Sequence, residues 1–218
     1  MTRTGFDYAL DELNNDLLRM GSIVEKQIHQ CIEALVKQDE KLAEQIIEND
    51  DLVDKLEREI ENKCIKLIAK EQPLAIDLRT IISTTKLVTD LERIADYAVD
   101  IAKITIRLKN ETYIKELIDI PKMGDVVKEM IRKALDAHVA GDVEGAYAAC
   151  KMDDEVDALY RNIFSELVGL MQKGQNNFNQ ITQLLFVSKH LERVGDHITN
   201  VCEWTIYLVT GEQKDLND

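Results

Sequence analysis

Two pairs of carboxylates recur in this chain at a spacing that suits cation binding. The segment Leu-Glu-Arg-Ile-Ala-Asp carries Glu92 and Asp96, and 100 residues later Leu-Glu-Arg-Val-Gly-Asp carries Glu192 and Asp196. Residues four apart lie on one face of a helix. Two carboxylates placed in this way either repel each other or share a cation.

A second acidic pair is repeated as well. Asp50 and Asp54 lie in Asp-Asp-Leu-Val-Asp, and Asp153 and Asp157 lie in Asp-Asp-Glu-Val-Asp, at an offset of 103 residues. Two copies of roughly 100 residues are typical of a duplicated bundle rather than a solenoid of short repeats. The chain is therefore interpreted as one three-helix unit used twice, with two carboxylate pairs in each copy.

Four carboxylates brought together without a counter-charge raise one another's pKa values and destabilise the fold. A bound cation removes this repulsion, and ligand sets made only of oxygen suit ions such as Mg, Mn, Ca or iron. Asp100 and Asn200 continue the two acidic stripes, so they are candidate outer ligands or hydrogen-bond partners. A closed structural zinc site is not indicated, because no Cys or His has matching spacing.

Salt bridges are the alternative explanation of the same acids. Arg58 and Arg161 repeat in the two copies, as do Arg93 and Arg193. The carboxylates could therefore form ion pairs on helix surfaces or between helices, and a duplicated network of such pairs would leave the same pattern. The residues alone leave metal binding and ion pairing both open.

Other catalytic motifs are absent from the sequence. It has no Glu-x-x-His pair of the ferritin-like di-iron type, no Gly-rich phosphate loop and no Gly-x-Ser-x-Gly elbow. His190 and His197 flank the second acidic motif and are interpreted as surface or packing residues. Trp204 and Tyr207, near the end of the last helical pattern, are interpreted as packing residues too.

Six helices would position these groups, according to apolar periodicity and helix breakers. Asp39 and Asp142 are predicted N-caps of the second and fifth helices, and Pro121 is predicted to open the fourth. The expected helices cover about residues 6–37, 39–70, 74–108, 121–140, 142–172 and 178–210.

The turns predict how the acidic pairs meet. The midpoints of the two pairs in the first copy are residues 52 and 94, and halfway between them lies Pro73, at the turn between two helices. In the second copy the midpoints are 155 and 194, centred on 174.5, within the break at Gly174–Gln175. Antiparallel helices folding back at these turns would place each set of four carboxylates at one height.

Composition excludes several classes of protein. The net charge is −14, with 41 acidic and 27 basic residues, and no basic stripe for nucleic acid is visible. No apolar run approaches the roughly 20 residues that a membrane-spanning helix needs, and no secretory signal is recognised, so no direct membrane insertion is expected. The four cysteines are widely spaced and are interpreted as buried free thiols in a reducing, cytoplasmic compartment.

The chain resembles the PhoU family, the cytoplasmic regulators of bacterial phosphate uptake. The resemblance rests on the two Leu-Glu-Arg-Ile/Val-x-Asp segments, the two Asp-x-x-x-Asp segments before them, Gln72-Pro73, and Asp77-Leu-Arg79. It implies an all-α fold of two tandem three-helix bundles, with repeats at 1–109 and 121–211, a linker at 110–120 and a polar tail at 212–218.

The resemblance also implies a function and a set of metal ligands. The family couples the ATPase of the phosphate ABC transporter to a sensor histidine kinase, restrains the phosphate-starvation response, and is usually homodimeric. Its acidic motifs are associated with bound metal ions, here iron, Mn, Mg or Zn. The corresponding ligands are Asp50, Asp54, Glu92 and Asp96 in the first half, and Asp153, Asp157, Glu192 and Asp196 in the second.

Three hypotheses follow from the sequence. The first is a non-enzymatic adaptor that transmits phosphate status through protein contacts, with metal on its acidic faces. The second is a carboxylate-bridged metalloenzyme, a hydrolase or an oxidase, which would need an open coordination site and a general base. The third is a metal-free helical scaffold.

Overall fold

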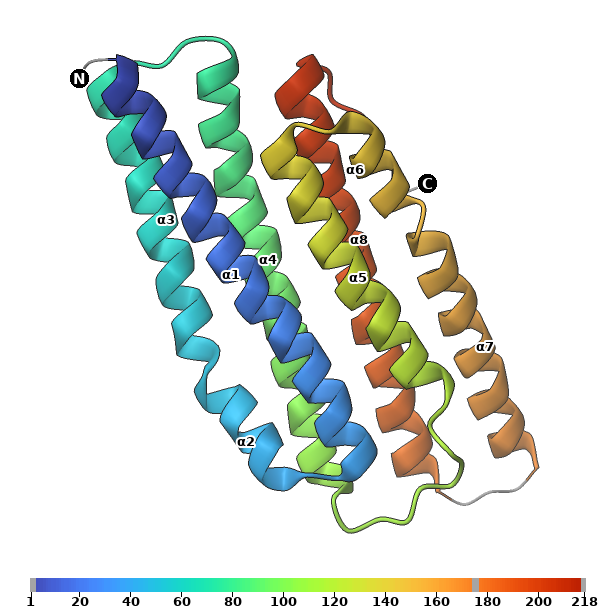
Figure 1. Cartoon of the computed structure of the whole chain (residues 1–218). Coiled ribbons are helices and arrows are strands. Elements are labelled where there is room, and N and C mark those ends of the chain that lie inside the picture. Colours follow the sequence, from blue (N-terminus) through green and yellow to red (C-terminus); the bar gives the residue numbers. More distant parts are fainter. Residues whose placement is uncertain (1–2, 174–176, 217–218) are drawn as a thin grey trace.

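The computed structural model describes residues 3–173 and 177–216, and in these residues the fold is all-α, as the sequence predicts (Figure 1). Within these described residues, eight helices follow one another: α1 Arg3–Lys37, α2 Glu40–Glu48, α3 Asp50–Glu71, α4 Ile76–Leu108, α5 Asp119–Ala140, α6 Val143–Cys150, α7 Asp153–Gln172 and α8 Phe178–Thr210.

The expected second and fifth helices are each broken in two, so the prediction of six helices was wrong in number. The breaks lie at Asn49 and at Lys151–Met152, immediately before the first acidic pair of each copy. Asp50 and Asp153 therefore open helices instead of lying in the middle of one. Carboxylates are favourable in a first helical turn, where unpaired N–H groups and the helix dipole attract negative charge.

The predicted N-caps are confirmed. The side chain of Asp39 accepts a hydrogen bond from the N–H of Leu42 at 3.1 Å, and Asp142 accepts one from Gly145 at 3.0 Å. Helix α5 begins at Asp119, two residues before the expected start at Pro121. A proline is tolerated in the first turn because its missing N–H has no partner there in any helix.

The two halves have the same arrangement of three long helices. Helices α1, α3 and α4 pack on one another in the first half, and α5, α7 and α8 do so in the second. In Figure 1, α3 and α7 lie at the two outer edges of the molecule, and α1 and α5 lie next to each other between them. The halves meet through α1 with α5 and, most extensively, α4 with α8, and one continuous core of Leu, Ile, Val and Ala fills them.

The turn between α3 and α4 lies at residues 72–75, around the expected Pro73. Gln72 ends α3 in the left-handed conformation, and Ala75 also has a positive φ of 50°. The corresponding break at Gly174–Gln175 lies outside the described residues. No helix in the described part is long and apolar enough to cross a membrane. The four cysteines are free thiols as expected, although Cys150 is only half-buried.

Candidate metal centres

The antiparallel helices α3 and α4 bring the first four carboxylates together, and we call Asp50, Asp54, Glu92 and Asp96 the first acidic patch. Burial raises the pKa of Asp50, and the charges of Asp96 and Asp54 add to the effect. Burial also raises the pKa of Glu92, and the charges of Asp96 and Asp54 act in the same direction. Asp50 and Asp96 are equally far from Pro73 along the chain, as are Asp54 and Glu92. The hairpin geometry expected from the turn is therefore present.

Helices α7 and α8 form the second acidic patch, which consists of Asp153, Asp157, Glu192 and Asp196. Burial raises the pKa of Asp153 to about 7, and the charges of the other three carboxylates act in the same direction. The other three carboxylates therefore lie within electrostatic reach of Asp153. Each half thus carries the four-carboxylate patch that its sequence predicts.

Burial and like charge both act on the first patch as well. Burial raises the pKa of Glu92 to about 7, helped by Asp96 and opposed by Arg93. Only 17% of the Glu92 side chain is exposed. The helix N-terminus favours a charged Asp50, yet burial and its acidic neighbours still raise the pKa of that carboxyl. Burial and like charge therefore both disfavour the charged forms of Glu92 and Asp50.

The repeated arginines do form the ion pairs of the alternative explanation. Arg58 contacts Asp54 at 3.0 Å and Arg93 contacts Asp96 at 3.1 Å; the equivalent pairs join Arg161 to Asp157 at 3.4 Å and Arg193 to Asp196 at 3.2 Å. The arginine side chains are 52–70% exposed. Exposed pairs of this kind contribute roughly 0–1 kcal/mol each to stability.

The donor set fits a hard or borderline metal ion. Asp153 has one buried carboxylate oxygen, Oδ1, that has no hydrogen-bond partner, although such an atom normally requires one. Within residues 3–173 and 177–216, no three His, Cys, Asp or Glu side chains are already arranged to hold an ion. Side-chain rotation away from the exposed arginines would therefore accompany binding.

Gly195 is a site residue that the sequence reasoning missed. A Cβ atom at this position would lie 2.1 Å from Oδ1 of Asp153, so only glycine lets that carboxylate lie against the backbone of α8. Ala95 holds the equivalent position in the first half and is fully buried. The available signal was a glycine inside a predicted helix. Glycine lowers helix stability by about 1 kcal/mol relative to alanine, so a glycine at such a position indicates close packing that leaves no room for a side chain.

The two patches also differ in their surroundings. Glu57 adds a fifth acid to the first patch, where its charge raises the pKa of Glu92. Tyr160 stands at the matching position of the second copy, and the ammonium of Lys189 lies 5.4 Å from the centre of its ring. Lys189 also pairs with Glu192 at 2.5 Å, whereas Thr89 occupies the matching position in the first copy. The first patch is therefore the more acidic of the two.

The outer candidates have partners away from the patches. Asp100 forms a 3.0 Å ion pair with Lys103, and the amide of Asn200 donates a 3.0 Å hydrogen bond to Asp90. His197 also donates to Asp90, and His190 packs its ring on Tyr97 with centroids 5.4 Å apart. The contacts of Asn200, His197 and His190 join α8 to α4, so the two histidines pack between the halves.

The family of the chain follows from comparison with known proteins. Residues 17–105 and 120–205 match the PhoU domain. The chain belongs to the PhoU family. It is 55% identical, over the full length of both chains, to the phosphate-specific transport system accessory protein PhoU homolog of Clostridium acetobutylicum.

Solved PhoU structures have the same fold. The phosphate transport system regulatory protein PhoU of Streptococcus pneumoniae has a TM-score of 0.90 and 34% identity, covering 96% of this chain and 99% of that one. PhoU of Pseudomonas aeruginosa also has a TM-score of 0.90, with 36% identity over 95% of this chain and all of the other. The predicted duplicated PhoU fold is thus confirmed.

Proposed function

We propose that this chain is a non-enzymatic cytoplasmic regulator of phosphate uptake. It contacts the ATPase of a phosphate ABC transporter and a sensor histidine kinase, and it restrains the phosphate-starvation response when phosphate is plentiful. The observation that carries this proposal is the 55% identity over full length with a phosphate transport accessory protein. We also expect a homodimer.

The position of the acidic patches supports an adaptor. Their carboxylates lie on helix surfaces, and Asp96 and Asp157 are 41% and 46% exposed. Sites for small substrates are usually concave and enclose most of the ligand. An exposed acidic face is better suited to contact with another protein, directly or through a bound cation.

Metal ions would relieve the repulsion within each patch. The eight carboxylates would hold iron, Mn, Mg or Zn, and the bound ions would supply positive charge that fixes the carboxylates in position. Asp153 contributes most clearly, because its buried Oδ1 has no other partner. Charge neutralisation at the patches would change the surface that partner proteins meet.

Gene deletion tests the regulatory role. In a strain that lacks the gene, a phosphate-starvation reporter such as alkaline phosphatase should be expressed constitutively at high phosphate. The wild-type gene should restore repression. Continued repression in the deletion strain would contradict the proposal. Complementation with a single variant that carries four substitutions then tests whether the patches are needed for signalling. The substitutions are Glu92→Gln, Asp96→Asn, Glu192→Gln and Asp196→Asn.

A further inference from the structure

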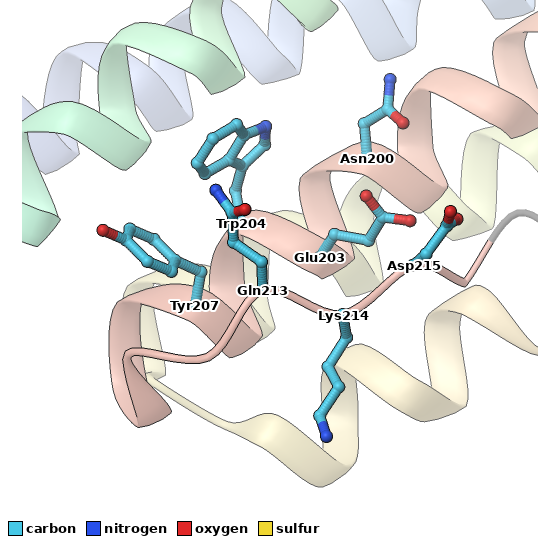
Figure 2. A pocket seen from close by; sticks show the side chains of 7 residues that line it. All are labelled: Asn200, Glu203, Trp204, Tyr207, Gln213, Lys214 and Asp215. Carbon is cyan, nitrogen blue, oxygen red and sulfur yellow. The ribbon is translucent and has the colours of Figure 1, made fainter.

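A cavity of about 450 Å³ lies between the C-terminal half of α8 and the tail that follows it (Figure 2). Its walls are the face of α8 from Asn200 to Tyr207 and the tail residues 213–215. Gly211 ends α8 with a φ of +77°, and the tail then runs back along the helix. The backbone N–H of Leu216 donates a 2.8 Å hydrogen bond to Glu203, which fixes the tail in place.

One wall of the cavity is aromatic. Trp204 and Tyr207 pack edge to face, with ring centroids 5.7 Å apart, as expected of packing residues. The same two rings also line the cavity. The ammonium of Lys86 lies 6.0 Å from the centre of the Trp204 ring, so this indole already attracts a cation through its electron-rich face.

The opposite wall is acidic. Figure 2 shows the carboxylates of Glu203 and Asp215 next to each other on the side of the cavity away from Tyr207. Burial raises the pKa of Glu203, and the charges of Asp215 and Asp90 add to the effect. Lys214 also lines the cavity, but its ammonium pairs with Glu212 at 3.3 Å and points away from the two carboxylates.

We propose that this cavity binds an organic cation of the alkylguanidinium or alkylammonium class. A guanidinium donates to carboxylates through its N–H groups while its flat face stacks on an aromatic ring. Glu203 and Asp215 supply the acceptors, and Trp204 supplies the ring. The carboxylates disfavour phosphates and other anions, and the aromatic ring beside them favours an organic cation over a bare metal ion. The cavity is distinct from the two acidic patches and does not depend on the proposed function.

Trp204 provides the readout, because it is the only tryptophan in the chain. Ethylguanidinium represents a free cation, and the peptide acetyl-Ala-Arg-Ala-amide represents an arginine side chain of a partner protein. Ethylurea and the citrulline peptide are their neutral counterparts. Titration of the full chain at constant ionic strength should give a saturable fluorescence change with a Kd on the order of millimolar for the cations. The tighter of the two cations identifies the source of the ligand.

Matched substitutions separate the site from general charge effects. Glu203→Gln keeps an acceptor for the Leu216 N–H and removes the charge, so it should weaken binding roughly tenfold. Glu44→Gln removes the same charge from an exposed position on α2, outside the cavity lining, and should leave the Kd unchanged. Isothermal titration of Trp204→Leu should show weaker binding than the wild type.

Three results would overturn the proposal. They are the absence of saturation by either cation, equal responses to the neutral counterparts, and equal weakening by Glu203→Gln and Glu44→Gln. Circular dichroism of each variant should match the wild type, since none of the altered side chains is fully buried.

Discussion

The imidazole Nδ1–H of His197 donates a 2.8 Å hydrogen bond to the carboxylate of Asp90, across the seam between the two halves. Positions 90 and 190 correspond in the repeat, as do 97 and 197. The equivalent contact in the other direction is the ring pair of His190 and Tyr97, with centroids 5.4 Å apart. The same two positions of the repeat therefore meet twice across the seam. Asp90 and His197 meet through a hydrogen bond, and His190 and Tyr97 meet through ring packing.

Removal of the Asp90 carboxylate should loosen this seam. Asp90→Ala leaves His197 and Asn200 without their shared acceptor, so we expect a loss of about 1–3 kcal/mol in the free energy of unfolding. Urea denaturation measures it, and a double-mutant cycle with His197→Ala should give a coupling of at least 0.5 kcal/mol. Asp125→Ala is the control, because Asp125 forms an exposed pair with Lys128 and should change stability by less than about 0.5 kcal/mol. Additive effects of the two seam substitutions would contradict the contact.

Stability should depend on the protonation of His138. Its Nδ1–H donates to Thr205, whose own proton goes to the carbonyl of Val201, so the neutral ring leaves Nε2 buried without a partner. Burial lowers the pKa of His138 to about 4 from an ordinary value of 6.5. The unfolded chain therefore takes up a proton before the folded one, and stability falls as the pH drops from 6.5 to 4.

His138→Gln removes this titration while keeping a donor for Thr205. We compare the free energy of unfolding of the variant with that of the wild type. As the pH falls from 7.5 to 4, the difference should change by about 3 kcal/mol in favour of the variant. Chemical denaturation at several pH values measures the difference. Glu92 and Asp153 act on stability in the opposite direction, because their raised pKa values favour the folded state as the pH falls. Both proteins contain these two residues, so their effect cancels in the comparison. Parallel stability curves for the two proteins would show that His138 is not the titrating group.

Gly195→Ala should affect the second acidic patch more than the fold. The new methyl group meets the end of a flexible side chain, so Asp153 rotates away while the helix gains up to about 1 kcal/mol of propensity. We expect at least tenfold weaker Mn²⁺ binding at the second patch, measured calorimetrically in a chain whose first patch carries Glu92→Gln and Asp96→Asn. Ala95→Gly is the control, since it should lower stability with little effect on this affinity. Unchanged binding by Gly195→Ala would contradict a binding role for the position that Asp153 occupies against Gly195.

Exchange of the residues at positions 89 and 189 should exchange the properties of the patches. Lys189→Thr removes the ammonium that pairs with Glu192, so Mn²⁺ affinity at the second patch should rise roughly tenfold. Thr89→Lys places an ammonium beside Glu92 and Glu57 and should weaken the first patch by a similar factor. Competition titrations in chains with the other patch neutralised give both affinities. Each patch is measured with and without its substitution at position 89 or 189. Equal Mn²⁺ affinities with and without the substitutions would show that a lysine at this position does not control binding.

The repeat and the turn were sufficient to predict which carboxylates meet. Side-chain positions on a helix follow from sequence spacing, so equal distances from Pro73 place Asp50 level with Asp96. The caps at Asp39 and Asp142 follow from local chemistry and were predicted for the same reason. The eight carboxylates could therefore be grouped correctly from sequence.

The helix breaks and the close packing could not be predicted in this way. The apolar stripe continues from Ile46 to Val53 through the break at Asn49, where neither Gly nor Pro interrupts it. The approach of Asp153 to Gly195 and the contact of the Lys189 ammonium with the ring of Tyr160 depend on how α7 packs on α8. Such contacts between helices are set by tertiary packing, and spacing within one helix does not determine them.

Metal content is the most direct test of whether the acidic patches bind ions. The full chain is purified without chelator, and inductively coupled plasma mass spectrometry measures the metal bound per chain. We expect stoichiometric iron, Mn, Mg or Zn, lost in the Glu92→Gln, Asp96→Asn, Glu192→Gln, Asp196→Asn variant, and a lower Tm of the wild type after EDTA treatment. Equal metal content in wild type and variant, with a Tm that EDTA leaves unchanged, would contradict metal binding at the patches.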